Sequence, residues 1–216
     1  MMTKYYVIHV KDESAGEYPD SYDWDNPYAP SKLRKYIRDH KEFPSFTPNL
    51  ELEIYDDSEF NKINDFIFGP IKTFCISEKV KRILNTFNLP KHRYYPVKVL
   101  EPRKYLGIFK TKKEIKNPYY AFCYDSFHIS NLDNCIDFDR TSITKDSMGI
   151  DKSDEVFFKN NFDHSLDLFE IRLSWMTYVS ERLKESLIKE EVTGIEFSEI
   201  NERKYMVDRP NPKLIW

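Results

Sequence analysis

Glycine is scarce in this chain. Only five of the 216 residues are glycine, whereas 12 are proline. Loops that cradle phosphate groups are rich in glycine, because their backbone amides must approach the phosphates closely. The sequence therefore offers little from which a nucleotide-binding loop could be built. It also contains no Gly-x-Ser-x-Gly turn of the kind that presents the nucleophile in serine hydrolases.

Cysteine and long apolar runs are also in short supply. The three cysteines, Cys75, Cys123 and Cys135, lack metal-ligand spacing, so we expect reduced thiols buried as small hydrophobic side chains. No segment approaches the ~18 apolar residues of a membrane span. The apolar run near the N-terminus is shorter than that of a signal peptide and lacks a small-residue cleavage site. We expect a cytoplasmic protein with no membrane partner.

Aromatic residues, in contrast, are plentiful. The chain has 15 Tyr, 16 Phe and 3 Trp, and 40% of its residues are hydrophobic. Disordered chains are poor in aromatics, so we expect order along most of the length. A chain of this size can bury a core without disulfides or metal ions, as one domain or as two closely packed lobes.

Charge is balanced in total but separated along the chain. The formal net charge is −3, from 33 basic and 36 acidic side chains. Residues 12–25 contain six acidic residues and no Lys or Arg, whereas residues 78–116 contain twelve Lys or Arg and three Glu. Residues 117–170 are acidic again. Such blocks create local fields that steer charged partners, although they are equally consistent with solvated faces.

The hydrophobic pattern predicts an α+β fold with a mixed sheet and packed helices. Leu50, Leu52 and Ile54 alternate with glutamates, the pattern of a half-buried strand. Further strands are expected at 5–10, 95–99, 119–124, 135–138, 168–173 and 195–200. Helices are expected at 31–40, 59–68, 77–87 and 180–187. Pro96 indicates the start of its strand or a position at a sheet edge.

A helix followed by a strand is predicted twice. When Ser77 is aligned with Ser180, Glu78 matches Glu181 and Leu84 matches Leu187. Each serine can cap its helix, and each glutamate favours the positive end of the helix dipole. We therefore expect a repeated helix–strand unit within one fold. The main domain is expected at 73–200, with a strand and acidic loop at 1–72 packed on it and a tail at 201–216.

We expect neither a metal ion nor a cofactor. No two of the five histidines have the i, i+4 spacing of a zinc-binding helix. Asp137 and Asp139 would share one face of an extended strand and could bind a divalent cation. The alternative is that both carboxylates face solvent and flank a buried Phe138.

We also expect that the chain is not an enzyme. Ser77 and Ser180 are explained as helix caps. A pairing of Cys123 with His128 stays open, because such pairs form in space rather than in sequence, but Cys123 lies in a run that is expected to be buried. The alternative is an enzyme whose site is assembled only in the fold.

Lys and Arg residues interleave with aromatic residues within residues 78–116, the basic stretch. A surface that contacts phosphates and stacks bases has this composition, whereas the sequence pI of 6.0 disfavours nucleic-acid binding. A nucleic-acid-binding module using residues 78–116 is therefore kept as an alternative. The interleaved residues are Lys91, Arg93, Tyr94, Tyr95, Lys98, Arg103, Lys104 and Tyr105.

The acidic block at 12–25 is the best candidate for binding a partner. Tyr and Trp are enriched at binding hot spots, and charge complementarity raises association rates and selectivity. In the alternative, the aromatics anchor the loop to the core. The predicted partner-binding residues are Tyr18, Asp20, Tyr22, Asp23, Trp24 and Asp25.

Residues 73–200 resemble the eleventh immunity-protein class of bacterial polymorphic toxin systems. The similar segments are ISEKVK (76–81), YPVKV (95–99), LFEIR (168–172), VSERLK (179–184) and TGIEFSEI (193–200). The resemblance implies an α+β cytosolic protein that binds and blocks a cognate protein toxin encoded beside it. It carries over no catalytic residues, because the shared positions are structural. It identifies neither the toxin nor the oligomeric state.

Overall fold

The computed structural model describes a large part of the chain. The described residues are 4–11, 16–17, 36, 43, 47–54, 63–68, 74–105, 109–124, 136–141, 144–145, 151–152, 157–171 and 176–199. The predicted tail at 201–216 lies outside them. So does the predicted helix at 31–40, apart from Tyr36, which is helical.

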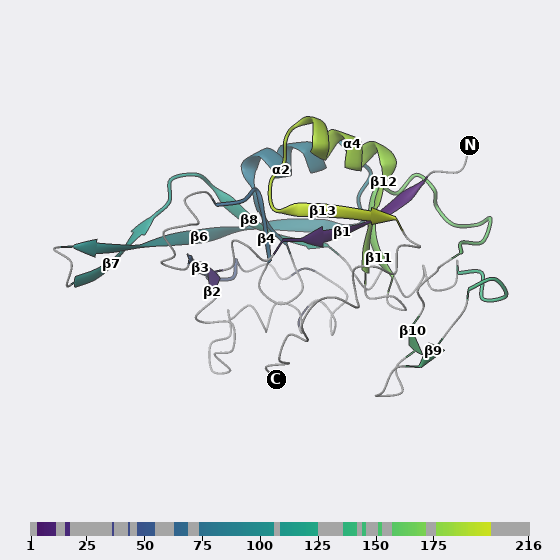
Figure 1. The fold of residues 1–216 in the computed structure, drawn as a ribbon, viewed down its shortest axis with the longest axis horizontal. Coiled ribbons are helices and arrows are strands. Elements are labelled where there is room, and N and C mark those ends of the chain that lie inside the picture. Colours follow the sequence, from purple (N-terminus) through teal and green to yellow (C-terminus); the bar gives the residue numbers. More distant parts are fainter. Residues whose placement is uncertain are drawn as a thin grey trace.

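Strands make up most of the described structure, which is a mixed α+β fold (Figure 1). The larger sheet has seven strands in the order β2-β3-β6-β8-β5-β4, and β7 pairs with β6. Only β3 and β6 run parallel; the other pairs are antiparallel. Its strands are β2 (Gly16–Glu17), β3 (Leu50–Ile54), β4 (Phe66–Phe68), β5 (Phe74–Ser77), β6 (His92–Tyr105), β7 (Phe109–Glu114) and β8 (Tyr119–Tyr124).

The smaller sheet has four antiparallel strands in the order β11-β12-β1-β13. They are β1 (Tyr5–Val10), β11 (Leu168–Ile171), β12 (Met176–Ser180) and β13 (Ile195–Glu199). Strand β1, from the N-terminal end of the chain, thus lies between two strands from the C-terminal part. A separate short ladder joins β9 (Thr144–Lys145) to β10 (Asp151–Lys152).

The two sheets meet where β13 begins. Phe66 of β4 donates its N–H to the carbonyl of Thr193 at 3.0 Å, and Lys11 donates to the carbonyl of Gly194 at 2.9 Å. Gly194 has φ +87°, and a Cβ there would lie 2.2 Å from the Phe66 carbonyl oxygen. Only glycine fits this position, because it accepts a positive φ and leaves room for the neighbouring backbone.

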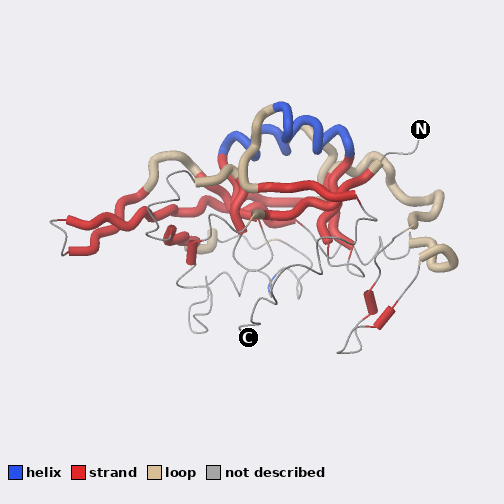
Figure 2. The backbone as a smooth tube through the Cα atoms, viewed as in Figure 1, coloured by secondary structure: helices blue, strands red, loops and turns tan. Residues whose placement is uncertain are grey.

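Two helices cover one face of the sheets and contact each other (Figures 1 and 2). They are α2 (Glu78–Leu84) and α4 (Glu181–Lys189). Ser77 and Ser180 cap them as predicted: each hydroxyl accepts a hydrogen bond from a backbone N–H of the first turn. Helix α2 buries Val80, Ile83 and Leu84 against the sheets. No described helix is long and apolar enough to span a bilayer.

Alternation along the strands divides the apolar side chains into three clusters. One cluster lies between the helices and the sheets, and the others lie on the opposite faces of the larger and smaller sheets. The first contains Tyr6, Ile8, Val10, Phe66, Ile76, Val80, Ile83, Leu84, Phe122, Tyr124, Leu168, Val179, Leu183 and Leu187. The second contains Leu50, Leu52, Ile67, Cys75, Tyr95, Val97, Val99, Tyr119, Ala121 and Cys123. The third contains Tyr5, Val7, Ile136, Phe162, Leu166, Phe169 and Tyr178.

Two predicted elements are wrong. Residues 66–68, expected within a helix at 59–68, form strand β4, because Phe66 faces the helices while Ile67 faces the opposite cluster. Of residues 135–138, expected as a strand, the described residues 136–138 contribute only an isolated bridge from Ile136 to Phe158, and residues 138–140 form a turn. Phe138, expected to be buried, is 51% exposed.

The strand containing Pro96 is longer than predicted. Residues 95–99 lie within the 14-residue strand β6, so Pro96 does not start it. In the described ladder β3 pairs with β6 only from Val97 onward, whereas Pro96 is opposite Tyr120 of β8. The missing N–H of proline is tolerated because β6 has one paired neighbour at this position.

The predicted repeated helix–strand unit is not supported. The strand after α2 is β6, which is long and lies inside the larger sheet. The strand after α4 is β13, which has five residues and ends the order of the smaller sheet. The sequence match reflects how the two helices begin, and it does not extend to the strands that follow.

Candidate functional site

The predicted partner-binding residues lie outside the described part of the chain. This applies to Tyr18, Asp20, Tyr22, Asp23, Trp24 and Asp25. The same is true of His128 and Cys135.

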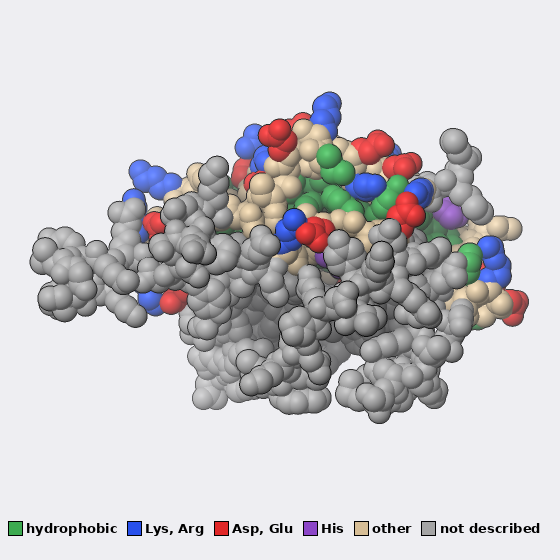
Figure 3. All heavy atoms as spheres, in the orientation of Figure 1, with side chains coloured by type: hydrophobic (Ala, Val, Ile, Leu, Met, Phe, Trp, Pro, Cys, Tyr) green, Lys and Arg blue, Asp and Glu red, His purple; other side chains and the backbone are tan. Residues whose placement is uncertain are grey.

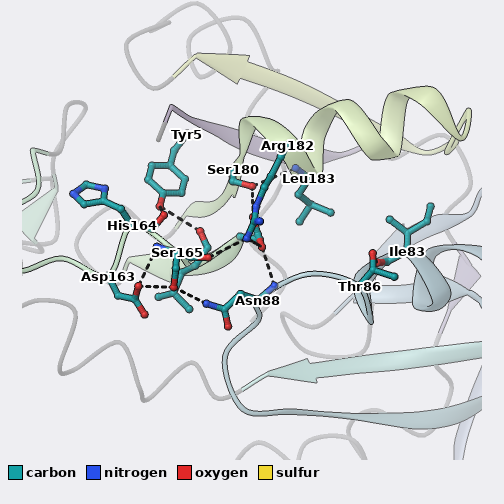
Figure 4. Close-up of polar contacts among 12 residues, drawn as sticks. Tyr5, Ile83, Thr86, Asn88, Asp163, His164, Ser165, Ser180, Arg182 and Leu183 are labelled. Atoms are coloured by element: carbon teal, nitrogen blue, oxygen red, sulfur yellow. Dashed lines mark hydrogen bonds and ion pairs between the residues drawn. The ribbon is translucent and has the colours of Figure 1, made fainter. Parts of the chain in front are cut away.

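A buried carboxylate dominates the polar contacts beside α4. Asp167 is fully buried, and its Oδ1 accepts hydrogen bonds from Ser180 Oγ at 2.6 Å and Arg182 Nε at 2.5 Å. Its Oδ2 accepts from Arg182 Nη2 at 2.6 Å and from the Asn88 N–H at 2.8 Å. Figure 4 shows Ser180, Arg182 and Asn88 converging from different elements. We call these four residues the Asp167 cluster.

The Asp167 cluster neutralises and saturates its carboxylate. Burying a carboxylate is costly unless a countercharge and hydrogen-bond donors accompany it. The guanidinium of Arg182 supplies the charge through two parallel bonds, and the hydrogen bonds with Asp167 raise the pKa of Arg182. Because four donors already occupy Asp167, a structural role explains its burial.

A matching arrangement lies beside α2. Asp65 accepts hydrogen bonds from Ser77 Oγ at 2.7 Å and from the Thr193 N–H at 3.2 Å, and Lys79 Nζ lies 2.9 Å from its Oδ2. Burial opposes ionisation, but the bonds from Lys79, Ser77 and Thr193 outweigh it and hold the pKa of Asp65 below its usual value. We call Asp65, Ser77, Lys79 and Thr193 the Asp65 cluster.

The two clusters are crossed. Asp65 binds the cap and first-turn base of α2, but its third partner, Thr193, follows α4. Asp167 does the reverse, since it binds the cap and base of α4 together with Asn88, which follows α2. Each helix start is therefore fastened to the segment that follows the other helix.

The sequence contained a signal for these aspartates that we did not use. Each aspartate directly precedes a strand, and the cap serines follow 12 and 13 residues later. A lone Asp before an apolar segment is common. The aspartates stand out only because each lies 12 or 13 residues before a cap serine, and because the two helix starts share a Ser-Glu-base sequence.

Asp137 and Asp139 do not form a metal site with other ligands in the described structure. The Oδ1 of Asp137 accepts the N–H of Asp139 at 3.2 Å, and its carbonyl accepts the N–H of Thr141 at 2.9 Å. Asp137 thus organises a turn, as Asp side chains often do. No group of three or more His, Cys, Asp or Glu residues is placed to hold a metal among the described residues.

The described cysteines are packing residues. Cys75 is 0% and Cys123 2% exposed, so the prediction of buried thiols is confirmed for both. Burial raises the pKa of the Cys123 thiol to about 12. A nucleophilic cysteine needs a thiolate, and this environment opposes its formation.

The basic stretch is divided among several environments. Lys79 belongs to the Asp65 cluster, and Lys81 Nζ lies 3.7 Å from the centroid of the Tyr120 ring. Tyr95 is buried, and burial raises the pKa of the half-buried Tyr94 to about 12. These tyrosines pack in the protein and do not form a base-stacking surface. Over the helices, Figure 3 shows acidic and basic side chains intermixed around hydrophobic ones.

The outer part of the basic stretch is a projecting ribbon. The outer part of β6, from Glu101 to Tyr105, pairs only with β7 in the described structure, and this ribbon extends beyond the other strands (Figure 1). We call residues 100–105 and 109–114 the β6–β7 arm. Lys112 forms an ion pair with Glu53 at its base, and Lys98 pairs with Glu51 at 3.1 Å nearby.

Comparisons with known proteins give no relative from which a role could be taken. No family model matches the chain, and no curated protein matches it significantly. The candidate functional surface is therefore defined by the geometry and charge of the β6–β7 arm.

Proposed function

We propose that this chain is an immunity protein that neutralises a cognate bacterial toxin by direct stoichiometric binding. The observation that carries the proposal is the β6–β7 arm, a charged ribbon that projects from the body. Projecting charged elements steer and orient a macromolecular partner. The described groups that were candidates for chemistry, such as Cys123 and Asp137, have structural roles.

The acidic residues at 18–25 supply a second contact in this proposal. Their block carries charge opposite to that of the arm, so together they would match a partner with two oppositely charged regions. Trp24 and the neighbouring tyrosines would supply the apolar anchors that dominate binding energy. Both contacts would act by covering the toxin's functional surface, and neither requires a cofactor.

Co-expression with the product of the adjacent gene tests this function. We expect this chain to restore the growth of cells that express the adjacent gene's product. We also expect the two proteins to co-elute at fixed stoichiometry in size-exclusion chromatography. Restored growth without a complex would favour an enzymatic antidote. If growth is not restored and no complex forms, that pairing is refuted and the other functions are reopened.

Substitutions in the acidic loop test where the toxin binds. We expect Trp24→Ala, and charge reversal of Asp23 and Asp25, to abolish the complex while leaving the melting temperature within a few degrees of wild type. A large fall in melting temperature would instead indicate that these residues anchor the loop to the core.

Nucleic-acid binding is the second candidate, favoured by the ribbon form of the arm. The major groove of DNA admits a two-stranded β-ribbon, and basic residues would contact the phosphates. This function predicts an affinity that falls steeply as salt is raised. Titration of a labelled duplex at two salt concentrations would detect it.

A further inference from the structure

The turn at residues 136–141 exposes an aromatic side chain between two buried residues. Phe138 is 51% exposed, whereas Ile136 before it is 1% and Thr141 after it is 5% exposed. Ile188 of α4 is a comparable apolar side chain, at 56%. Because single exposed apolar side chains are common on soluble proteins, the setting of Phe138 decides what it can do. We call residues 136–141 the Phe138 turn.

Contacts with residues 157–158 anchor both ends of the Phe138 turn. Ile136 forms a β-bridge with Phe158 and belongs to the third apolar cluster, against which Phe158 packs. The Asp137 N–H donates to the carbonyl of Phe157 at 2.8 Å. The Phe157 N–H in turn donates to Thr141 Oγ1 at 3.1 Å. The ends of the turn are therefore held by the core of the protein.

Hydrogen bonds within the turn fix its tip as well. The Asp137 carbonyl accepts the N–H of Thr141 at 2.9 Å and that of Arg140 at 3.3 Å. Its Oδ1 accepts the N–H of Asp139 at 3.2 Å. The backbone that carries Phe138 is thus in place before a partner arrives. Association costs less conformational entropy when the contact residue lies on such a preorganised segment.

Acidic side chains flank the exposed ring. Asp137 and Asp139 adjoin Phe138 in sequence, and Asp139 is exposed while Asp137 is half-buried. The guanidinium of Arg140, the basic group of the turn, lies 4.2 Å from the centroid of the Phe157 ring, so it contacts the anchoring segment. Carboxylates repel phosphate groups, which makes a nucleic acid a poor occupant. An apolar ring between carboxylates instead complements a protein surface that is apolar at its centre and basic around it.

We propose that the Phe138 turn is a contact for the toxin, in which the Phe138 ring enters an apolar pocket with a basic rim. This inference rests on the proposed immunity function and names the chemistry of the toxin surface that the turn binds. Aromatic side chains are enriched at the centres of protein interfaces, and complementary charge around them selects the partner. Exposure of a residue that sequence reasoning would bury is also characteristic of functional sites.

Removing the ring separates binding from folding. Phe138→Ala should weaken the complex with the adjacent gene's product by about tenfold, because the side chain that fills the pocket is lost. The melting temperature should stay within about 3 °C of wild type, since the ring is already half in water. Titration calorimetry measures the affinity, and thermal unfolding measures the stability.

Ile188→Ala is the matched control for apolar surface. It truncates a side chain of similar exposure that lies on α4, outside the turn. Its affinity for the adjacent gene's product should stay within about twofold of wild type. If Ile188→Ala weakens the complex as much as Phe138→Ala does, the loss is not specific to the turn and the inference is overturned.

A charge reversal tests the basic rim and does not depend on the behaviour of Phe138→Ala. Asp139→Lys should weaken the complex by about tenfold at low salt and by less at high salt. Glu185→Lys is its control, because Glu185 is exposed on α4 and the change in net charge is the same. If Phe138→Ala fails to fold, this pair of variants decides the inference: equal affinities for the two would overturn it.

The wild-type titration distinguishes failure of the inference from failure of the proposed function. If wild type binds and both Phe138→Ala and Asp139→Lys bind as tightly, the Phe138 turn is not a contact, while the immunity function stands. If wild type itself does not bind the adjacent gene's product, that pairing is refuted and the inference falls with it.

Discussion

The Asp65 and Asp167 clusters both stabilise an ionised aspartate beside a helix start, but the two aspartates are buried to different depths. Both hold an aspartate between a cap serine, a first-turn base and a backbone N–H. The side chain of Asp65 is 19% exposed and its base is a lysine, whereas that of Asp167 is 0% exposed and its base is an arginine. The deeper carboxylate has the bidentate partner, because a guanidinium satisfies both oxygens where water cannot reach.

Removing the basic side chain of each cluster should give the largest difference in stability between the two clusters. Arg182→Ala leaves Asp167 buried without a countercharge, and we expect a loss of about 3 kcal/mol in the free energy of unfolding. Lys79→Ala should cost about 1 kcal/mol or less, because water can solvate the more accessible Asp65. Urea denaturation measures both values.

Arg182→Lys provides the matched control for charge. It keeps the positive charge but loses the two parallel bonds, so its cost should fall between those of wild type and Arg182→Ala. Equal losses for Arg182→Ala and Lys79→Ala would show that the depth of the carboxylate does not govern the difference.

Removing the hydroxyls of the two cap serines should give a smaller difference in stability between the clusters. Ser180 is fully buried and its hydroxyl joins Asp167 to the N–H of Leu183, so Ser180→Ala should cost about 2 kcal/mol. Ser77 is half-buried and bonds the Val80 N–H at 3.4 Å, so Ser77→Ala should cost about 1 kcal/mol. Thermal unfolding of both variants gives the order, and a larger loss for Ser77→Ala would contradict it.

Acid should reveal the smallest difference. The pKa of Asp65 is lowered from 3.8 in the fold, so the ionised form stabilises the protein above pH 3.8 and that contribution is lost as the pH falls below it. Asp65→Asn should therefore be less stable than wild type at neutral pH, and the gap should narrow between about pH 5 and pH 2. Urea unfolding across this range tests the sign, and a gap that widens on acidification would refute it.

Local signals predicted the parts of the fold that depend on nearby residues. The caps at Ser77 and Ser180 and the strands at 5–10, 50–54 and 119–124 follow from spacing and alternation, and the structure has them. Strand β4 was missed because its form depends on pairing with β5 and on the two apolar clusters that it separates. No local pattern at 59–68 carries that information.

The candidate site was only partly predictable. The excess of bases at 78–116 was visible in the sequence, but their division into helix, buried sheet and projecting arm depends on strand pairing. The register that places residues 101–105 opposite residues 109–113 cannot be read from a local sequence pattern. Residues 18–25 remain a prediction from sequence alone.

The crossed fastening of the helix starts has a consequence for how the chain folds. The bond from Thr193 to Asp65 joins residues 128 apart in sequence, and that from Asn88 to Asp167 joins residues 79 apart. Each helix start is completed only when its own long-range contact has formed. High contact order of this kind slows folding, and we expect α2 and α4 to exchange their amide hydrogens as one cooperative unit.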